Sequence, residues 1–138
     1  KKCFDELILN KVDISGIILK PNMILAGNQS KHKISNEEVA EKTLKCLKNS
    51  VPSEVPGIAF LSGGQSEIEA TENLNLINKN NNTTFILTYS YGRALQQSAL
   101  RVWSETNKDM QKTQIMFNHR AKMCTLAAKA KWSIELEN

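Results

Sequence analysis

The sequence predicts an α/β fold in which strand–helix units follow one another along the chain. Three apolar runs, at residues 14–19, 57–61 and 84–89, each lead through a polar connection into a segment whose apolar residues have helical spacing. Short connections of this kind place successive strands parallel, with right-handed crossovers between them. We therefore expect a parallel sheet or barrel covered by helices.

The first strand follows a predicted helix at residues 1–11. Three apolar residues of that segment have helical spacing: Phe4, Leu7 and Ile8. Ile14 and the mostly β-branched run 17–19 then predict a strand that is buried on both faces, and Pro21 ends it. Lys20 is therefore expected at the end of a buried strand.

Two predicted helices begin at serine–glutamate pairs with the spacing of a capping box. The pairs are Ser35 with Glu38 and Ser66 with Glu69. The first helix follows the polar loop 27–33 and is expected to end near Asn49, and the second ends at the asparagine-rich turn 78–82. Their expected buried faces carry Val39, Thr43, Leu44 and Leu47 in the first helix, and Ala70, Leu74 and Ile77 in the second.

The second and third strands complete the repeating pattern. Pro52 and Pro56 bracket the connection to the run 57–61, and the run 84–89 leads through residues 90–93 into another helix. That helix carries Leu95, Ala99, Val102 and Trp103. A last helix is predicted from about Asn107, with a packing face made by Met110, Phe117, Ala121, Cys124 and Ala128. Because this face spans barely three heptads, we favour a packed outer helix over a coiled coil.

The length of the chain limits how much of a barrel it can form. Three strands cannot close a barrel, and a complete (β/α)₈ barrel takes about 250 residues, whereas this chain has 138. We therefore predict that residues 1–138 are the C-terminal portion of one domain, the second half of a (β/α)₈ TIM barrel. That half has three parallel strand–helix units and a C-terminal helix. The chain begins with Lys1 rather than Met, so we expect it to begin inside a longer one.

Composition argues against several classes of function. The 18 basic and 14 acidic residues give a net charge of +4, which is too small and too dispersed to indicate nucleic-acid binding. The densest basic stretch lacks interleaved aromatic residues and is interpreted as a solvated helix face. It contains Lys108, Lys112, Arg120, Lys122, Lys129 and Lys131. Neither a signal peptide nor a membrane span is expected, because acidic residues interrupt the N-terminus before any long apolar run.

Cysteine and histidine content indicates no metal site. Cys3, Cys46 and Cys124 are odd in number and far apart, a pattern that favours a reduced, cytoplasmic setting. His32 and His119 have no nearby ligand partners in the sequence. We predict that the protein holds no metal and no cofactor.

Residues after the three strands should meet, because the carboxyl ends of parallel strands share one edge. They are Lys20, then Ser62, Gly63 and Gly64, then Ser90, Tyr91, Gly92 and Arg93. A buried ammonium loses hydration, so its pKa falls and the neutral amine can form a Schiff base with a carbonyl. Glycine amides, helix starts and an arginine suit a phosphate. Together they favour a sugar-phosphate carbonyl substrate.

Each residue also has a simpler interpretation. A strand-end lysine commonly extends to water, a Ser-Gly-Gly sequence is commonly a turn, and an arginine is commonly a surface charge. Their combination at three successive strand ends favours the chemical interpretation.

Three runs of the sequence closely resemble class I fructose-1,6-bisphosphate aldolase. They are Leu19-Lys20-Pro21-Asn22-Met23, the run Val55-Pro56-Gly57-Ile58-Ala59-Phe60-Leu61-Ser62-Gly63-Gly64-Gln65-Ser66-Glu67, and Ser90-Tyr91-Gly92-Arg93-Ala94-Leu95-Gln96. The resemblance extends from about residue 12 to residue 130 and preserves the order and spacing of the motifs. It identifies the chain as similar to the C-terminal half of that family.

The resemblance implies a glycolytic lyase. Lys20 would form the Schiff base with fructose 1,6-bisphosphate, which is cleaved reversibly to dihydroxyacetone phosphate and glyceraldehyde 3-phosphate. The implied ligands of the ketone-side phosphate are Ser62, Gly63, Gly64, Ser90 and Arg93, with the backbone of Gly92 as a helper. The resemblance also implies a cytoplasmic homotetramer without a metal, because the iminium replaces the Lewis acid.

Other parts of the family's site have no counterpart in residues 1–138. Its acid–base carboxylates, and its lysine and arginine for the second phosphate, precede the Schiff-base strand, and its tail ends in a tyrosine. Two alternatives therefore stand beside an enzyme completed by another segment or chain. One is a catalytically silent or truncated relative that serves as a sugar-phosphate-binding or protein-interaction module. The other is a Schiff-base relative that acts on a different ketose phosphate.

Overall fold

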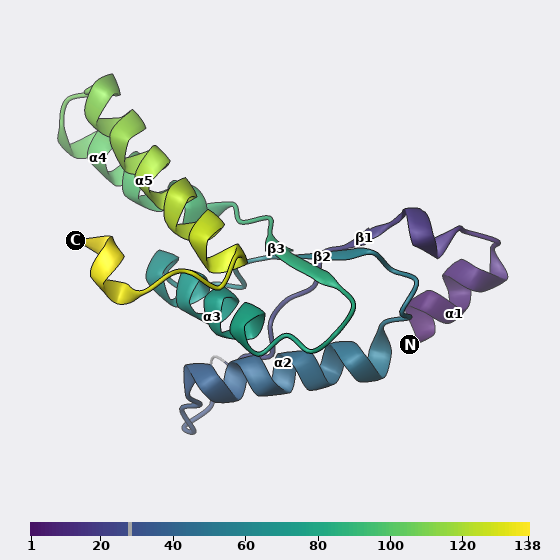
Figure 1. The fold of residues 1–138 in the computed structure, drawn as a ribbon. Coiled ribbons are helices and arrows are strands. Elements are labelled where there is room, and N and C mark those ends of the chain that lie inside the picture. Colours follow the sequence, from purple (N-terminus) through teal and green to yellow (C-terminus); the bar gives the residue numbers. More distant parts are fainter. Residues whose placement is uncertain (28) are drawn as a thin grey trace.

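The computed structural model describes residues 1–27 and 29–138, which form a three-stranded sheet with helices around it (Figure 1). In chain order the elements are α1 (Lys2–Leu9), the 3₁₀ turn η1 (Ile14–Gly16), β1 (Ile18–Leu19), α2 (Asn36–Ser50), β2 (Gly57–Phe60), α3 (Glu67–Lys79), β3 (Ile86–Tyr89), α4 (Arg93–Glu105), α5 (Met110–Ala128) and the 3₁₀ turn η2 (Ile134–Glu137). All three predicted strand–helix units are present. Asn28, within the predicted loop 27–33, lies outside the described residues.

The sheet is parallel and has the strand order β1-β2-β3, which confirms the predicted α/β class. Gly57 of β2 pairs with both Ile18 of β1 and Ile86 of β3. Backbone contacts continue past the strands, since the Leu61 amide donates to the Pro21 carbonyl at 3.0 Å. The carboxyl ends of the three strands therefore lie at one edge of the sheet.

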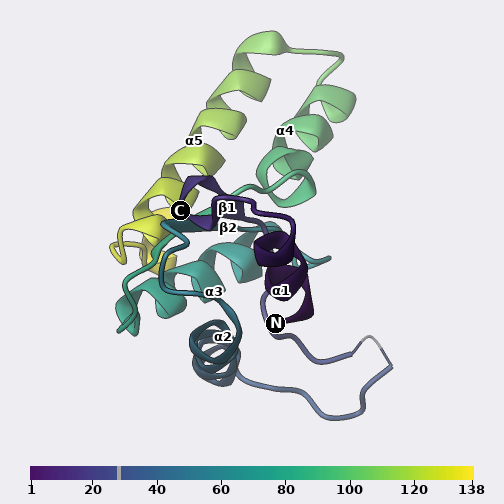
Figure 2. The same cartoon turned by 90° about the vertical axis from the view of Figure 1, so that its right-hand side faces the viewer.

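Helices α2 and α3 pack side by side and cover one face of the sheet (Figures 1 and 2). The predicted apolar faces of both helices are buried. The largest fully buried apolar side chains of the core are Phe60, Met23, Ile58, Leu74, Ile77 and Val55. Burial of these side chains, each worth about 1.5–3 kcal/mol, fixes the position of the strand ends relative to the helices.

Capping explains where α2 and α3 begin. At α3 the capping box is complete, because Ser66 Oγ accepts from the Glu69 amide and the Glu69 carboxylate accepts from the Ser66 amide. At α2, Ser35 Oγ accepts from the Glu38 amide, and the Glu38 carboxylate pairs with Lys42. The sequence pattern therefore located both helix starts correctly.

The prediction that the first strand is buried on both faces is wrong. Its regular part is only Ile18–Leu19, with Ile14 in the preceding 3₁₀ turn, and Ile18 is 62% exposed. Ile86, in the same cross-strand row, is 73% exposed. The cause is that β1 is an edge strand of the described sheet, and this end of the sheet has no cover on its second face.

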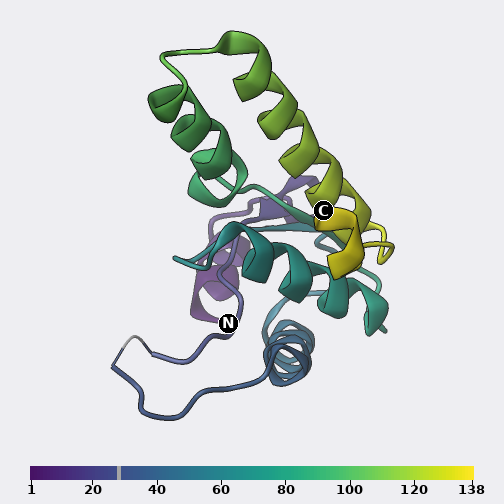
Figure 3. The same cartoon turned by 90° about the vertical axis from the view of Figure 1, so that its left-hand side faces the viewer.

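The predicted face of α5 is only partly correct. Cys124 is buried, but Met110 and Phe117 are 63% and 38% exposed. The first half of α5 projects beyond the sheet beside α4 as a two-helix hairpin, and α5 also contacts α3 (Figures 1 and 3). The helix begins at Met110 after the cap Asp109, not at Asn107, whose φ of 51° is left-handed. Within the described residues, no helix has the length and apolar character to cross a membrane.

Candidate functional site

Lys20 follows β1 directly, at the edge where the three strands end. Its neighbour Pro21 accepts the amide hydrogen of Leu61, so Lys20 lies beside the end of β2. The residue is exposed, contrary to the burial that the apolar run predicted. Lys20 is two positions from the exposed Ile18, so its side chain lies on the same, uncovered face of the sheet. Lys20 therefore has the expected place in the fold without the expected desolvation.

The loop after β2 contains two glycines in the left-handed region. The φ angles of Gly63 and Gly64 are 59° and 85°, a conformation that side chains with a Cβ rarely adopt. A Cβ on Gly63 would overlap the side-chain amide of Asn22, which follows β1. The ends of β1 and β2 are therefore in direct contact at Gly63.

The loop after β3 is held by Tyr91. The Tyr91 side chain is 6% exposed, and its hydroxyl donates to the Ala70 carbonyl of α3 at 2.8 Å. Burial raises the pKa of this phenol above its ordinary value, so Tyr91 acts as a neutral donor. Ser90, just before it, donates its amide to the Phe60 carbonyl at 2.8 Å and is exposed. Arg93 is exposed at the first turn of α4.

A cleft of about 460 Å³ joins part of the predicted site. Its lining includes Ser62, Gly64 and Arg93, together with Gln65, Gln96, Gln97 and Leu100. Gly63 lies instead on a neighbouring hollow lined by residues 22–27. Lys20 and Ser90 line neither space, although both lie at the same sheet edge. The structure therefore brings three of the six predicted site residues to one cleft.

The electrostatics of this edge favour an anion. Helices α3 and α4 begin at Glu67 and Arg93, so their positive dipole ends point toward the loops. The charge of Glu67 is engaged elsewhere, because its carboxylate accepts from Ser98 and pairs with Arg101 at 3.6 Å. Among the residues described, no group of three or more His, Cys, Asp or Glu side chains could hold a metal ion.

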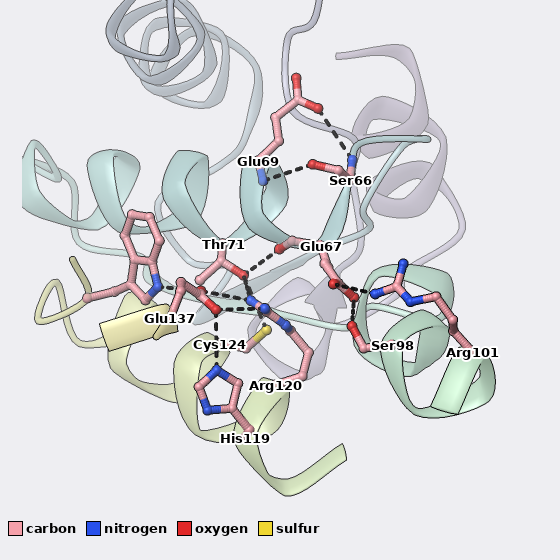
Figure 4. A network of polar contacts seen from close by, with 11 residues as sticks. Ser66, Glu67, Glu69, Thr71, Ser98, Arg101, His119, Arg120, Cys124 and Glu137 are labelled. Atoms are coloured by element: carbon pink, nitrogen blue, oxygen red, sulfur yellow. Dashed lines mark hydrogen bonds and ion pairs between the residues drawn. The ribbon is translucent and has the colours of Figure 1, made fainter. Parts of the chain in front are cut away.

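A buried ion pair that the sequence did not reveal links α5 to the C-terminal turn η2 (Figure 4). Arg120 donates to Glu137 through two nitrogens, at 2.9 and 2.7 Å, and its guanidinium also reaches Thr71. Trp132 Nε1 donates to the same carboxylate at 2.8 Å, and His119 Nε2 lies 3.3 Å from it. The interpretation of Arg120 as solvated is therefore wrong, since the residue is 4% exposed. The sequence did not reveal this pairing, because Glu137 is 17 positions after Arg120 and no local pattern connects the two residues.

The fold and this edge define a parallel α/β protein with a lysine at the carboxyl end of one strand and a cleft lined by Ser62, Gly64 and Arg93 beside it. The chain belongs to the class I fructose-bisphosphate aldolase family, because a family model described as "Glycolytic: Fructose-bisphosphate aldolase class-I" matches residues 1–138. The family assignment confirms the resemblance that the three motifs carry.

Similar proteins agree with this family. A probable class 1 fructose-bisphosphate aldolase of Xylella fastidiosa is 42% identical over 133 residues, covering 96% of this chain and 40% of the relative. Chloroplastic fructose-bisphosphate aldolase 3 of Arabidopsis thaliana is 47% identical over 135 residues, covering 98% of this chain and 34% of the relative. The chain thus spans about 40% or less of the length of these relatives.

A solved structure supports the half-barrel architecture. It is fructose-bisphosphate aldolase from Plasmodium falciparum, crystallised with TRAP and a small-molecule inhibitor. The match has a TM-score of 0.89 and 41% identity, and covers 94% of this chain and 38% of that one. Residues 1–138 therefore have the fold of part of an aldolase TIM barrel.

Proposed function

We propose that the chain supplies the Schiff-base lysine and one phosphate site of a class I fructose-bisphosphate aldolase. The observation that carries the proposal is the convergence of Lys20, the glycine loop and Arg93 at one strand edge, in a chain of this family. Ser62, Gly63, Gly64, Ser90 and Arg93 bind the ketone-side phosphate, with the Gly92 backbone beside them. The acid–base groups and the second phosphate site come from the part of the barrel outside residues 1–138.

The reaction follows from an amine beside a bound ketose phosphate. Lys20 Nζ adds to the ketone carbon of fructose 1,6-bisphosphate and, after loss of water, forms a protonated iminium. A base removes the proton of the C4 hydroxyl, the C3–C4 bond breaks, and its electron pair moves into the iminium to give an enamine. Glyceraldehyde 3-phosphate leaves first. Protonation of the enamine and hydrolysis then release dihydroxyacetone phosphate and restore Lys20.

Because Lys20 is exposed, the proposed reaction requires the rest of the barrel to cover it. The exposed amine of Lys20 keeps its hydration shell, whereas nucleophilic lysines are typically desolvated in an apolar pocket. Strands that close the barrel would cover the face of the sheet that carries Lys20, Ile18 and Ile86. Completing the barrel would therefore bury this apolar surface and desolvate the Lys20 amine in the same step.

The same exposure favours a second candidate function. A chain in which Lys20 remains in water would keep the anion cleft of Ser62, Gly64 and Arg93 and lack turnover. Such a chain would act as a sugar-phosphate-binding or protein-interaction module. The two functions differ in whether completing the barrel produces aldol cleavage.

A chimera tests the enzyme directly. The segment of the Xylella fastidiosa relative that precedes the matched region would be joined to residues 1–138, and cleavage of fructose 1,6-bisphosphate measured. We expect cleavage that Lys20→Ala abolishes and Lys122→Ala, an exposed lysine on α5, leaves unchanged. A folded, tetrameric chimera without cleavage would refute the enzyme and favour the module. Comparison with other ketose phosphates gives the specificity.

Assembly and location are also proposals. We infer from the family that the complete protein is a cytoplasmic homotetramer. Sedimentation equilibrium of the chimera tests the assembly, and a dimer or monomer would contradict it. Microscopy of the tagged protein in its source cells tests the location.

A further inference from the structure

Gln65 holds the glycine loop from inside the protein. It follows Gly64, is 8% exposed, and donates from Nε2 to the Ser62 carbonyl at 2.8 Å. The same nitrogen lies 3.6 Å from the sulfur of Met23, which is itself buried in the segment after β1. One side chain thus ties the start of the loop to its end and contacts the neighbouring strand end.

A second buried amide holds Gln65. Asn73, on the second turn of α3, is fully buried, and its Nδ2 donates to Gln65 Oε1 at 2.7 Å. The bond spans eight positions and connects the loop to the helix that follows it. Asn73, Gln65 and the Ser62 carbonyl therefore form a continuous relay of two hydrogen bonds.

The relay has only one workable direction. A backbone carbonyl can only accept, so Gln65 must present its nitrogen to Ser62 and its oxygen to Asn73. Asn73 must then present its nitrogen to Gln65. Neither a carboxylate nor an apolar side chain at position 65 or 73 can replace the donated hydrogen. Amide side chains have the size and the donor groups that positions 65 and 73 both require.

Asn73 also carries an energetic cost. Within the described part of the chain, its buried Oδ1 has no hydrogen-bond partner. A buried acceptor left unpaired is destabilising, and an apolar side chain would avoid this penalty. The two amides therefore stabilise the core less than apolar side chains would, but they fix the conformation of the loop.

We propose that Gln65 and Asn73 are positioning residues that set the conformation of the loop 62–64 for phosphate. The inference rests on the proposed function for its ligand, although the relay itself is independent of it. Gln65 also lines the cleft shared by Ser62, Gly64 and Arg93, which is the proposed phosphate site. Its effect is on binding of the phosphate group and not on the Lys20 amine.

Three substitutions by side chains of similar size disrupt the relay in different ways. Gln65→Glu replaces the donor by an acceptor, and Gln65→Met removes it without adding charge. Asn73→Asp breaks the second bond while leaving Gln65 in place. The matched controls are Gln111→Glu and Gln111→Met at an exposed glutamine of α5. If the buried glutamate of Gln65→Glu prevents folding, the uncharged pair Gln65→Met and Gln111→Met still provides the comparison.

Two measurements distinguish the conformation of the loop from the binding of its ligand, the first on the 138-residue chain and the second on the chimera that completes the barrel. The first is hydrogen exchange, by NMR, of the Gln65 backbone amide, which donates to the Ser62 carbonyl at 3.1 Å, at a pH where all variants are folded. The second is borohydride trapping on Lys20 with dihydroxyacetone phosphate and with dihydroxyacetone, which lacks the phosphate. Loss of one positioning hydrogen bond should speed exchange and lower the phosphate preference by about fivefold each. Trapping with dihydroxyacetone should not change, which distinguishes positioning from a general loss of structure.

Exchange and preference unchanged in the folded Gln65 variants would overturn the inference. If the unmodified chimera shows no preference for the phosphorylated ketone, the proposed phosphate site fails. The exchange rates alone then decide whether Gln65 positions the loop. Faster exchange in the Gln111 controls would also overturn it, since the effect would not depend on the relay.

Discussion

Gly63 combines a backbone requirement with a steric one. Its φ of 59° lies in the left-handed region, and its Cα faces the side-chain amide of Asn22. The Asn22 amide is the far end of a flexible side chain, so it can move aside at small cost. The backbone conformation cannot change without moving the loop, so strain is the larger effect.

We predict that Gly63→Ala lowers the free energy of unfolding by about 1–3 kcal/mol. Gly16→Ala, at a glycine with open space around it and no positive φ, should be neutral or slightly stabilising. Urea unfolding of both variants measures the difference. Equal midpoints for the two variants would show that the loop does not impose its conformation on Gly63.

Individual site residues were predictable to different degrees. Lys20 and Arg93 follow apolar runs, so the local pattern was enough to place them at strand ends. The burial of Lys20 depends on neighbouring strands, and the sequence carried no information on them. Gln65 and Asn73 gave no signal because the use of a buried amide depends on which carbonyl lies beside it.

At the scale of elements, the ion pair of Arg120 and Glu137 attaches the C-terminal turn to α5. Burial opposes ionisation of Glu137, but the hydrogen bonds from Arg120 and Trp132 and the Arg120 charge hold the pKa of the carboxyl below its ordinary value. A carboxyl with a lowered pKa stabilises the fold above the ordinary pKa of about 4.3. That stabilisation is lost as the pH falls through the lower, folded-state pKa.

We predict that Glu137→Gln costs about 3 kcal/mol at pH 7, because it leaves Arg120 buried without its counter-charge. The difference in melting temperature between this variant and the unmodified chain should shrink as the pH falls below about 4. Glu135→Gln, at an exposed position of the same turn, is the control. A difference that stays constant from pH 7 to pH 3 would contradict the account.

The starts and buried faces of α2 and α3 were predictable, whereas the face of α5 was predictable only in part. Ser35 and Ser66 act on amides within their own first turn, so the signal is local. The face of α5 depends on which other helices reach it. Periodicity placed Cys124 correctly and could not show that Met110 lies on a projecting hairpin.

At the scale of the whole molecule, the sheet leaves an apolar row in water. Ile18 and Ile86 flank Gly57 across the three strands, and both are more than half exposed. Such a row at an edge strand favours association with other chains. The local apolar pattern predicted burial of Ile18 instead, because it carries no information on which strands complete the sheet.

We predict that Ile18→Thr with Ile86→Thr lowers self-association of the 138-residue chain and changes the free energy of unfolding by about 1 kcal/mol or less. Ile58→Thr, at a fully buried neighbour, should instead lower stability by about 2 kcal/mol or more. Sedimentation velocity and urea unfolding measure the two effects. Unchanged association in the double variant would show that the exposed row is not a contact surface.

The most direct test of the account is borohydride trapping, with dihydroxyacetone phosphate, of the chimera that completes the barrel, followed by intact mass and peptide mapping. We predict one adduct, on Lys20, that is absent in Lys20→Ala and present in Lys122→Ala. No adduct in a sample shown to be folded would contradict the claim that this chain carries the nucleophile in working form. An adduct spread over several lysines would contradict it equally, because it would show that the strand edge does not select Lys20.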